Sequence, residues 1–319
     1  MGTGYGLANR INQIFDKHQL RLVKILRLGP RFFIALCEKG KTKYVLKINL
    51  YERYLNQDTR THNEHLAREA SFLKFIQAQK DFSLLKNGVP KIYDYDLTGQ
   101  QTWYLKDYTT GNFQNYQQSN FLFKGSFFTQ ENLNWIIKFF AELHRLSQKL
   151  TKKQRGIFHR HQLNDYLKLI NGQCIKKIFG PKLKNIYHFF QKYEKIFNQN
   201  QTALTHFEPY PVHFIKTKES LKIIDWENIG WGNSAHDIAV IWLRAYEKKN
   251  WQKILRKKFP LSTPLKNNWE ELFKVEIVVQ SLANLPYLMG TTDLNEKRVA
   301  PKISQFLKEQ SDLILANKF

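Results

Sequence analysis

The sequence has few cysteines, no long apolar run and too few acidic residues to balance its basic ones. Its two cysteines, Cys37 and Cys174, cannot by themselves form a disulfide framework or a zinc site, so we expect two buried thiols. No apolar run reaches the roughly 18 residues that a membrane-spanning helix needs. The N-terminal segment lacks the apolar stretch of a signal peptide, and Gly6 stands where a myristoylation pattern has Ser or Thr. These absences favour a cytoplasmic location with no membrane span.

Acidic residues are scarce relative to basic ones. The chain has 50 Lys and Arg residues against 27 Asp and Glu residues, which gives a net charge of +23. Such an excess favours anionic partners, namely nucleic acid, acidic lipid headgroups, or a phosphorylated or carboxylated substrate. The basic residues are dispersed, with no run of five or more. A lysine-rich surface without a specific partner therefore stays open as the alternative.

The 319 residues, 42% of them hydrophobic and 14% aromatic, are enough for one or two globular domains. Helical spacing of apolar residues predicts helices in the first third of the chain over 7–19 and 65–79. Extended apolar runs predict five strands, over 22–28, 32–37, 43–50, 91–96 and 101–108. Helices are predicted for most of the remainder, over 130–146, 164–172, 183–197, 235–248, 251–258, 268–285 and 298–317. The expected fold class is α+β, with a small antiparallel-sheet lobe over 1–108 and a mainly helical lobe over 109–319.

Lys47 lies inside the apolar run of the third predicted strand. An unpaired buried ammonium is costly, so this lysine needs an acidic partner. Glu69 lies beside the apolar face of the helix predicted over 65–79. A strand lysine paired with a helix glutamate is how protein kinases hold the phosphates of ATP. The alternative is an edge-strand lysine with its ammonium group in solvent.

Two short apolar segments each lead to a carboxylate. The segment 204–215 carries His206 and Glu208, and the segment 221–227 carries Asp225. Two strand-end carboxylates at this spacing, with a turn between them, are typical of a phosphoryl-transfer site, one for the nucleophile and one for the metal. An ordinary hairpin with acidic ends fits the spacing equally well.

The stretch IIDWENIGWGNSAHDIA, residues 223–239, resembles the signature IDWE-x-x-x-x-G-x-P-x-x-D-L-A of the aminoglycoside phosphotransferase and choline kinase family. The stretch FAELHRL, residues 140–146, is similar to the L-A-x-L-H-x-L helix of that family. Lys47, Glu69 and the strand at 103–111 also fall in the family's order. The resemblance covers roughly residues 20 to 290. It implies a bilobal protein-kinase-like fold, with ATP and Mg²⁺ as cofactors.

The resemblance also implies roles for residues of a nucleotide site. Lys47 would hold the nucleotide phosphates, Glu69 would orient Lys47, and Asp225 would bind the magnesium ion. Backbone groups of the strand at 103–111 would contact the adenine, at Lys106, Asp107 and Tyr108. The turn over 28–33, which would cover the phosphates, departs from the family because it has one glycine and because Pro30 lacks a backbone donor.

The catalytic loop departs further. The family reads H-G-D-x-x-x-x-N, whereas this chain reads HFEPYPVH over 206–213. Glu208 replaces the aspartate, whose carboxylate would position or deprotonate the acceptor hydroxyl. Because glutamate is one methylene longer, its carboxylate is displaced from the position of the aspartate carboxylate. His213 replaces the metal-binding asparagine, and an imidazole is a poor substitute for an amide oxygen on magnesium. His206 would pack beneath this loop, and Asp237 would brace it from the following helix.

Three functions stay open. The chain is an ATP-dependent phosphotransferase that acts on a hydroxyl of a small acceptor, a pseudokinase that serves as a binding or scaffolding module, or a basic nucleic-acid-binding protein. The net charge disfavours polycationic aminoglycosides, so an uncharged or anionic acceptor is expected. Five residues are candidates for contact with the acceptor, although a position on a solvated helix face is favoured for each of them. They are Asp165, Tyr166, Glu270, Glu271 and Glu276.

Overall fold

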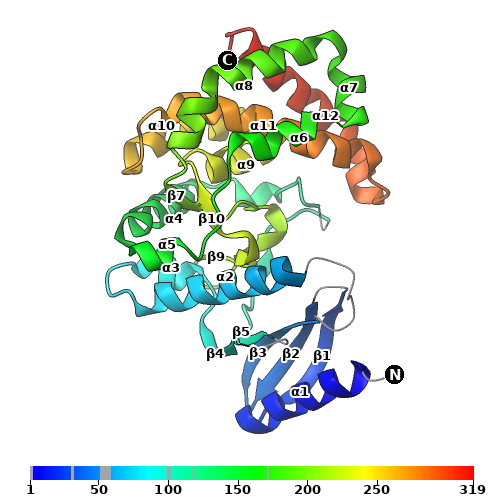
Figure 1. Ribbon diagram of the computed structural model, residues 1–319, viewed down its shortest axis with the longest axis vertical. Coiled ribbons are helices and arrows are strands. Elements are labelled where there is room, and N and C mark those ends of the chain that lie inside the picture. The colour runs from blue at the N-terminus through cyan, green and yellow to red at the C-terminus, as the bar shows by residue number, and fades with distance from the viewer. Residues whose placement is uncertain (1–2, 30–31, 51–58, 99–101, 118, 171) are drawn as a thin grey trace. The chain divides into compact units, whose positions relative to one another are not determined.

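The computed structural model describes residues 3–29, 32–50, 59–98, 102–117, 119–170 and 172–319 (Figure 1). The chain divides into two compact units, each of which makes most of its contacts internally. The first unit comprises Met1–Gly111 together with Lys222–Asn228, and the second comprises Asn112–Leu221 together with Ile229–Phe319. The segment that contains Asp225 therefore packs with the N-terminal part of the chain. Pro30 of the expected phosphate-covering turn lies outside the described residues.

The first unit is built on a five-stranded antiparallel sheet with the order β1-β2-β3-β5-β4. Its strands follow the predicted extended runs closely: β1 Arg21–Leu28, β2 Phe32–Lys39, β3 Thr42–Asn49, β4 Ile92–Asp96 and β5 Trp103–Asp107. A tight turn joins β2 to β3. Gly40 has a φ of 59°, a left-handed conformation that glycine adopts without steric cost. The predicted fold class is thus confirmed in this part of the chain.

Helix α1, Thr3–His18, covers one face of this sheet (Figure 1). Ile14 joins the apolar core that Phe33, Leu46 and other sheet residues form, and Ile11 packs against it. Because side chains alternate along a strand, Lys47 points to the opposite face from Leu46. Helix α2, Thr59–Ala78, lies on that side. It is followed by a short helix, α3, Ser83–Gly88, which was not predicted from the sequence periodicity.

The second unit is mainly helical, as predicted. Its central helix α11, Trp269–Gly290, is buried along most of its length, because it carries apolar side chains on all sides. The helices α6, α7, α8, α9 and α12 pack against it. The bounds of these and the remaining α-helices of this unit are α4 Gln130–Lys149, α5 Lys152–Arg155, α6 Leu163–Ile170, α7 Gln173–Phe179, α8 Leu183–Gln199, α9 His236–Arg244, α10 Lys249–Ser262 and α12 Leu294–Leu315.

Short strands hold the loop regions of the second unit. In Figure 1, β7, Ala203–Thr205, lies beside β10, Gly230–Gly232, with which it pairs antiparallel. Likewise β6, Asn112–Phe113, pairs with β8, Phe214–Lys216. A turn then leads to β9, Leu221–Ile223. The expected apolar strand over 204–215 is therefore interrupted.

The carboxylates lie beyond the strands that lead to them. The strand β7 ends three residues before Glu208, and β9 ends two residues before Asp225. Both carboxylates therefore belong to loops, where backbone conformation is less restricted than in a strand.

Two further expectations can be compared with the structure. Cys37 is buried as expected, and burial raises the pKa of its thiol to about 11. Cys174 is only partly buried, so that expectation is wrong for the second thiol, because α7 leaves it near the surface. Among the described residues, none of the helices is long and apolar enough to cross a membrane.

Candidate functional site

Lys47 is a buried cation at the centre of the first unit. It lies on β3, which is flanked by β2 and β5, and only 5% of its side chain is exposed. The Nζ atom lies 3.4 Å from Oε2 of Glu69 on α2. The expected lysine–glutamate pair is therefore present, and the edge-strand alternative is wrong because β3 is an inner strand.

Glu69 is fully buried, and three side chains from neighbouring strands hold it. Lys106 on β5 donates to Oε1 at 2.6 Å, and the Tyr104 hydroxyl donates to Oε2 at 2.7 Å. Burial alone would raise the pKa of Glu69, but the cations of Lys106 and Lys47 and these hydrogen bonds outweigh it and lower the pKa well below its usual range. Glu69 is therefore an ionised anchor that orients two lysines.

Two more carboxylates face Lys47 from the segment after β9. Glu227 Oε2 lies 2.5 Å from Lys47 Nζ, and Asp225 Oδ1 lies 3.7 Å from it. Burial alone would lower the pKa of Lys47, but Glu69, Asp225 and Glu227 outweigh it and raise the pKa above its usual value. The ammonium group thus stays charged although it is buried.

The segment 225–228 is fixed against α2. Trp226 is fully buried, its ring lies 4.5 Å from that of Phe72 on α2, and its indole N–H donates to the Ile223 carbonyl at 2.9 Å. The Asp225 backbone has a φ of 66°, which is uncommon for a residue other than glycine and marks a tightly determined position. The IDWE stretch is therefore a rigid corner that aims Asp225 and Glu227 at Lys47.

The donor set of this corner fits a hard divalent cation. Carboxylate oxygens of Glu69, Asp225 and Glu227 all lie within 4.8 Å of one another. Magnesium prefers such oxygen ligands. Glu69 is already bonded to Lys106 and Tyr104, so Asp225 and Glu227 are the ligands that would hold the ion. Glu227 was not predicted as a site residue, although the IDWE stretch contains it.

The strand expected to contact adenine is β5 with its C-terminal extension. The N–H groups of Asp107 and Tyr108 donate to the carbonyls of Lys91 and Lys43, at 2.8 and 3.1 Å. The Lys106 side chain is occupied by Glu69. A nucleotide at this segment would therefore use carbonyl oxygens, each of which has a second lone pair.

In the second unit, Asp237 holds the loop that follows β7. Its carboxylate accepts the backbone N–H groups of His206 and Phe207, at 2.9 and 3.0 Å. Burial raises the pKa of Asp237 to about 6, although the charge on His236 and these two donors favour the ionised form. Asp237 is therefore placed to brace the loop, as the resemblance implies.

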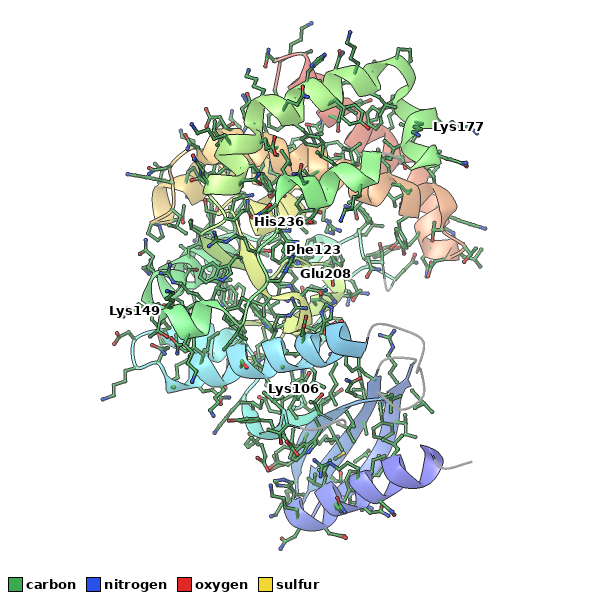
Figure 2. All side chains as sticks on the ribbon, in the orientation of Figure 1. Lys106, Phe123, Lys149, Lys177, Glu208 and His236 are labelled. Carbon is green, nitrogen blue, oxygen red and sulfur yellow. The ribbon has the colours of Figure 1, made fainter. Side chains whose placement is uncertain are left out.

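His236 braces the same loop from the adjacent position on α9. Its Nδ1 lies 2.8 Å from Oε2 of Glu276, and its Nε2 lies 3.3 Å from the Phe207 carbonyl oxygen. Burial alone would lower the pKa of His236, but the Glu276 carboxylate outweighs it and raises the pKa. A protonated ring donates to both acceptors. Figure 2 labels His236 and Glu208, which belong to this unit.

Glu276 itself was expected on a solvated helix face or, with less support, in contact with an acceptor. It is 1% exposed and also accepts the Asn233 amide N–H at 2.5 Å. The solvated-face expectation is wrong, because Glu276 lies on the buried side of α11 as an internal partner of His236, and this burial also disfavours contact with an acceptor. The His236–Glu276 pair was missed because the two residues are 40 positions apart.

The loop residues themselves are tightly bonded to one another. Phe207 has a φ of 69°, at the position where the family has glycine. The Glu208 N–H lies 3.3 Å from His206 Nδ1, and the Glu208 carbonyl lies 2.6 Å from His213 Nδ1. Because a carbonyl only accepts, Nδ1 of His213 carries the proton, and in the neutral ring Nε2 keeps the lone pair.

A buried arginine adds positive charge behind the loop. Arg244 is 2% exposed, and its guanidinium lies 4.2 Å from the Tyr210 ring centroid. Burial lowers the pKa of Arg244 to about 10, although the charge of Glu208 counteracts this. Arg244, at the end of α9, was not predicted to contact this loop.

Solved structures with similar folds match this chain along its whole length. Aminoglycoside 2'-phosphotransferase-IIIa, in its GDP complex, has 13% identity and a TM-score of 0.63, with 100% of both chains covered. The choline kinase LicA from Streptococcus pneumoniae has 13% identity and a TM-score of 0.59, with 98% of this chain and 99% of that chain covered. The amicoumacin kinase hAmiN, in complex with AMP-PNP, Ca²⁺ and Ami, has 12% identity and a TM-score of 0.58, with 98% and 97% covered.

The chain has the protein-kinase-like fold of aminoglycoside phosphotransferases and choline kinase. By sequence, no family model and no curated protein matches it. The fold expected from the IDWE stretch is thereby confirmed. At identities of 12–13%, the similarity establishes the architecture alone.

Within this kinase-like fold, the two sets of predicted residues belong to different units. Lys47, Glu69 and Asp225 lie in the first unit with residues 106–108, whereas His206, Glu208, His213 and Asp237 lie in the second. Of the acceptor-contact candidates, Asp165 is exposed at the start of α6, and Glu270 forms an ion pair with Arg256.

Proposed function

We propose that the protein is an ATP-dependent phosphotransferase that transfers the γ-phosphate to a hydroxyl group of a small acceptor. The observation that carries this proposal is the cluster in which the partly exposed Asp225 and Glu227 meet the buried Lys47–Glu69 pair. Removing Lys47 and Glu69 from water costs free energy that their attraction need not recover, so this buried ion pair is weak evidence for a purely stabilising role. Kinases use such a lysine–glutamate pair and a metal-binding aspartate to hold nucleotide phosphates.

In this proposal each residue of the first unit has one task. Lys47 exchanges its contact with Glu227 for the phosphate oxygens of the nucleotide. Glu69 and Lys106 keep the Lys47 ammonium oriented. Asp225 and Glu227 hold Mg²⁺, which when bound neutralises charge on the phosphate oxygens. Carbonyl groups in the segment 106–108 bind the adenine.

In the second unit, Glu208 positions the acceptor hydroxyl or accepts its proton. Phosphoryl transfer depends mainly on positioning and charge stabilisation, so a glutamate in place of an aspartate slows the reaction without abolishing it. His213 contributes its Nε2 lone pair as a metal ligand or as a hydrogen-bond acceptor. Asp237 and His236 keep the loop rigid through bonds to its backbone.

The acceptor in this proposal is uncharged or anionic. The net charge of +23 raises the energy of bringing a polycation to the protein. The Arg244 guanidinium behind the loop adds positive charge near Glu208. Cells that express the protein are therefore expected to stay sensitive to kanamycin-type aminoglycosides, and resistance would contradict this choice of acceptor.

A thermal-unfolding titration with ATP and Mg²⁺ tests nucleotide binding. We expect stabilisation of the wild-type protein, and loss of that stabilisation in Asp225→Asn and Lys47→Met, because a ligand that binds only the native state raises its stability. The matched control is Asp312→Asn, which removes an exposed carboxylate paired with Lys182. No stabilisation of the wild type at millimolar ATP would contradict the proposal.

A second experiment tests the loop. Glu208→Gln should still bind ATP and Mg²⁺ but should lose phosphoryl transfer to any acceptor that the wild type uses, because the amide cannot accept the hydroxyl proton. Full activity in this variant would show that Glu208 is not the base.

The second candidate function is that of a pseudokinase. Two observations favour it: Glu208 and His213 replace the expected aspartate and asparagine, and Lys47 forms a short contact with Glu227. A pseudokinase would bind nucleotide, if at all, without consuming it. ATP-dependent stabilisation with no ATP turnover across a broad panel of hydroxyl acceptors would favour this function.

A further inference from the structure

Two histidines and an aspartate of the second unit converge outside the residues assigned to phosphotransfer. Ligand atoms of His159, His161 and Asp165 all lie within 4.8 Å of one another. His159 and Asp165 are exposed, and His161 is partly buried, so an ion could reach them from solvent. We propose that these three side chains form a binding site for a divalent transition-metal ion of the zinc class.

The backbone brings the two imidazoles to one side. The His159 carbonyl accepts the Trp231 N–H at 2.7 Å, and the His161 N–H donates to the Trp231 carbonyl at 3.2 Å. The residue between them forms a parallel bridge with Trp231. This pins the segment in an extended form, in which residues two apart point the same way. The two ring centroids are 4.8 Å apart with an interplanar angle of 88°.

Asp165 approaches from the first turn of α6. Its Oδ2 accepts the Gln162 N–H at 3.0 Å, which fixes the carboxylate at the helix start. The Gln162 N–H bonds to Oδ2, and no hydrogen bond to Oδ1 is found among the described residues, so Oδ1 is the oxygen that would bind a metal. The hydrogen bond from Gln162 therefore holds the Asp165 carboxylate in place, and it can remain when Oδ1 binds a metal ion.

The donor types select the metal. Two imidazole nitrogens and one carboxylate oxygen suit Zn²⁺, Cu²⁺ or Ni²⁺, whereas magnesium and calcium prefer oxygen ligands alone. Three protein ligands with one position left for water is the pattern of accessible zinc sites. Around a tetrahedral zinc ion the ligands lie about 3.3 Å apart, since each bond is about 2.0–2.1 Å long. Small side-chain rotations bring atoms within 4.8 Å to that spacing.

The site touches the loop that carries Glu208. The His161 ring lies 4.1 Å from the Phe207 ring, centroid to centroid, and Phe207 is the residue with left-handed backbone between His206 and Glu208. A metal ion bound at His161 would hold this ring in place against Phe207. Metal binding itself requires neither nucleotide nor phosphotransfer, so it does not rest on the proposed function.

Titration of the metal-free full-length protein with Co²⁺, followed by its visible absorption and by displacement with Zn²⁺, tests the site. We expect one ion per chain. His159→Asn and Asp165→Asn should each weaken binding by more than about 100-fold, because losing even an outer partner of a metal ligand costs about 10–100-fold. Asp165→Asn keeps a carbonyl oxygen for the Gln162 N–H, so its fold is expected to be retained, which thermal unfolding with a chelator checks.

A control variant separates this site from other histidines. His188→Asn removes an exposed histidine of α8 and should bind Co²⁺ as the wild type does. Equal affinity in the wild type and in His159→Asn would overturn the proposal, because the ion would then lie elsewhere. Absence of binding to the wild type at micromolar Co²⁺ or Zn²⁺ would also overturn it.

Discussion

At the scale of single residues, buried charges determine which groups are held in place. Asp237 accepts two consecutive backbone N–H groups at the start of the loop that carries Glu208. These N–H groups lie beyond the paired residues of β7 and β10, so no strand carbonyl accepts them. They need another acceptor, since a buried N–H without a hydrogen bond lowers the stability of the fold. One carboxylate with two oxygens satisfies both donors, and an amide cannot.

Asp237→Asn should therefore destabilise the protein. The amide nitrogen would face one of the two backbone donors, which leaves a buried N–H unsatisfied at a cost of about 1–3 kcal/mol. Urea unfolding measures the change in the free energy of unfolding. Asp312→Asn, in an exposed ion pair with Lys182, is the control and should cost less than about 1 kcal/mol. Equal stability of Asp237→Asn and wild type would show that the two N–H groups find other acceptors.

Glu69 predicts how stability depends on pH. The pKa of Glu69 is lower in the folded protein than the value of about 4.3 for an unfolded chain. The native state thus favours the ionised form of Glu69. The ionised carboxylate contributes to the free energy of unfolding above about pH 4.3, and this contribution is lost as the pH falls through the pKa of Glu69 in the folded protein. Urea unfolding between pH 7 and pH 3.5 should show a steeper loss of stability for the wild type than for Glu69→Gln.

The control for this experiment is Glu131→Gln. Glu131 is 74% exposed and pairs with Lys216 at the surface, so its removal should leave the pH dependence nearly unchanged. A Glu69→Gln curve parallel to that of the wild type would contradict the assignment of this acid sensitivity to Glu69.

At the scale of elements, the packing of β10 against β7 sets the start of the loop. A Cβ atom on Gly232 would lie 2.6 Å from Thr205 Oγ1 and 3.1 Å from the Phe207 ring. Glycine at this position lets β10 approach β7 and its loop more closely than any other residue could. The IDWE stretch has a glycine here for a steric reason.

Gly232→Ala should destabilise the protein by about 1–3 kcal/mol, the usual cost of overpacking a filled core. The Thr205→Ala background removes the two side-chain atoms nearest to the new methyl group, so the same substitution should cost less there. Gly125→Ala, where a Cβ would meet no atom within 4 Å, is the control and should be close to neutral. Additive effects of the Thr205 and Gly232 changes in a double-mutant cycle would contradict a direct clash.

At the scale of the whole molecule, the net charge of +23 is spread along the chain and does not form one basic run. Dispersed lysines attract any polyanion through counterion release, which depends strongly on salt. Lys177 and Lys149, labelled in Figure 2, are on different helices of the second unit. This distribution favours a weak, nonspecific interaction over a dedicated nucleic-acid site.

Binding to a labelled single-stranded oligonucleotide should therefore be detectable at low salt and should fall by about 10³-fold or more between 50 and 200 mM salt, as for proteins that contact about six to ten phosphates. Fluorescence anisotropy measures this loss. Heparin, a polyanion without bases, should compete as well as unlabelled oligonucleotide. Sequence-selective binding that persists at 200 mM salt would instead support the nucleic-acid-binding function.

The sequence by itself determined the elements of the first unit, the helical character of the second and the kinase-like fold. Extended apolar runs mark the strands, and helical spacing places Glu69 beside the apolar face of α2. The order of Lys47, Glu69 and the IDWE stretch was enough to predict the fold, because these are local patterns in a known order. Helices such as α3 and α7 were missed, since short elements carry too little periodicity.

Only the tertiary structure decided which charged groups meet. Periodicity predicts the face on which a side chain lies, but not the side chain that meets it from an element far along the chain. Glu227 lies 180 positions from Lys47, and Glu276 lies 40 positions from His236, yet each pair is in contact. The three ligands of the proposed zinc-class site are close in sequence, but the bonds between 159–161 and Trp231 orient the two histidines and the start of α6 places Asp165. Burial makes these pairings strong, because a charge removed from water must find its partner within the fold.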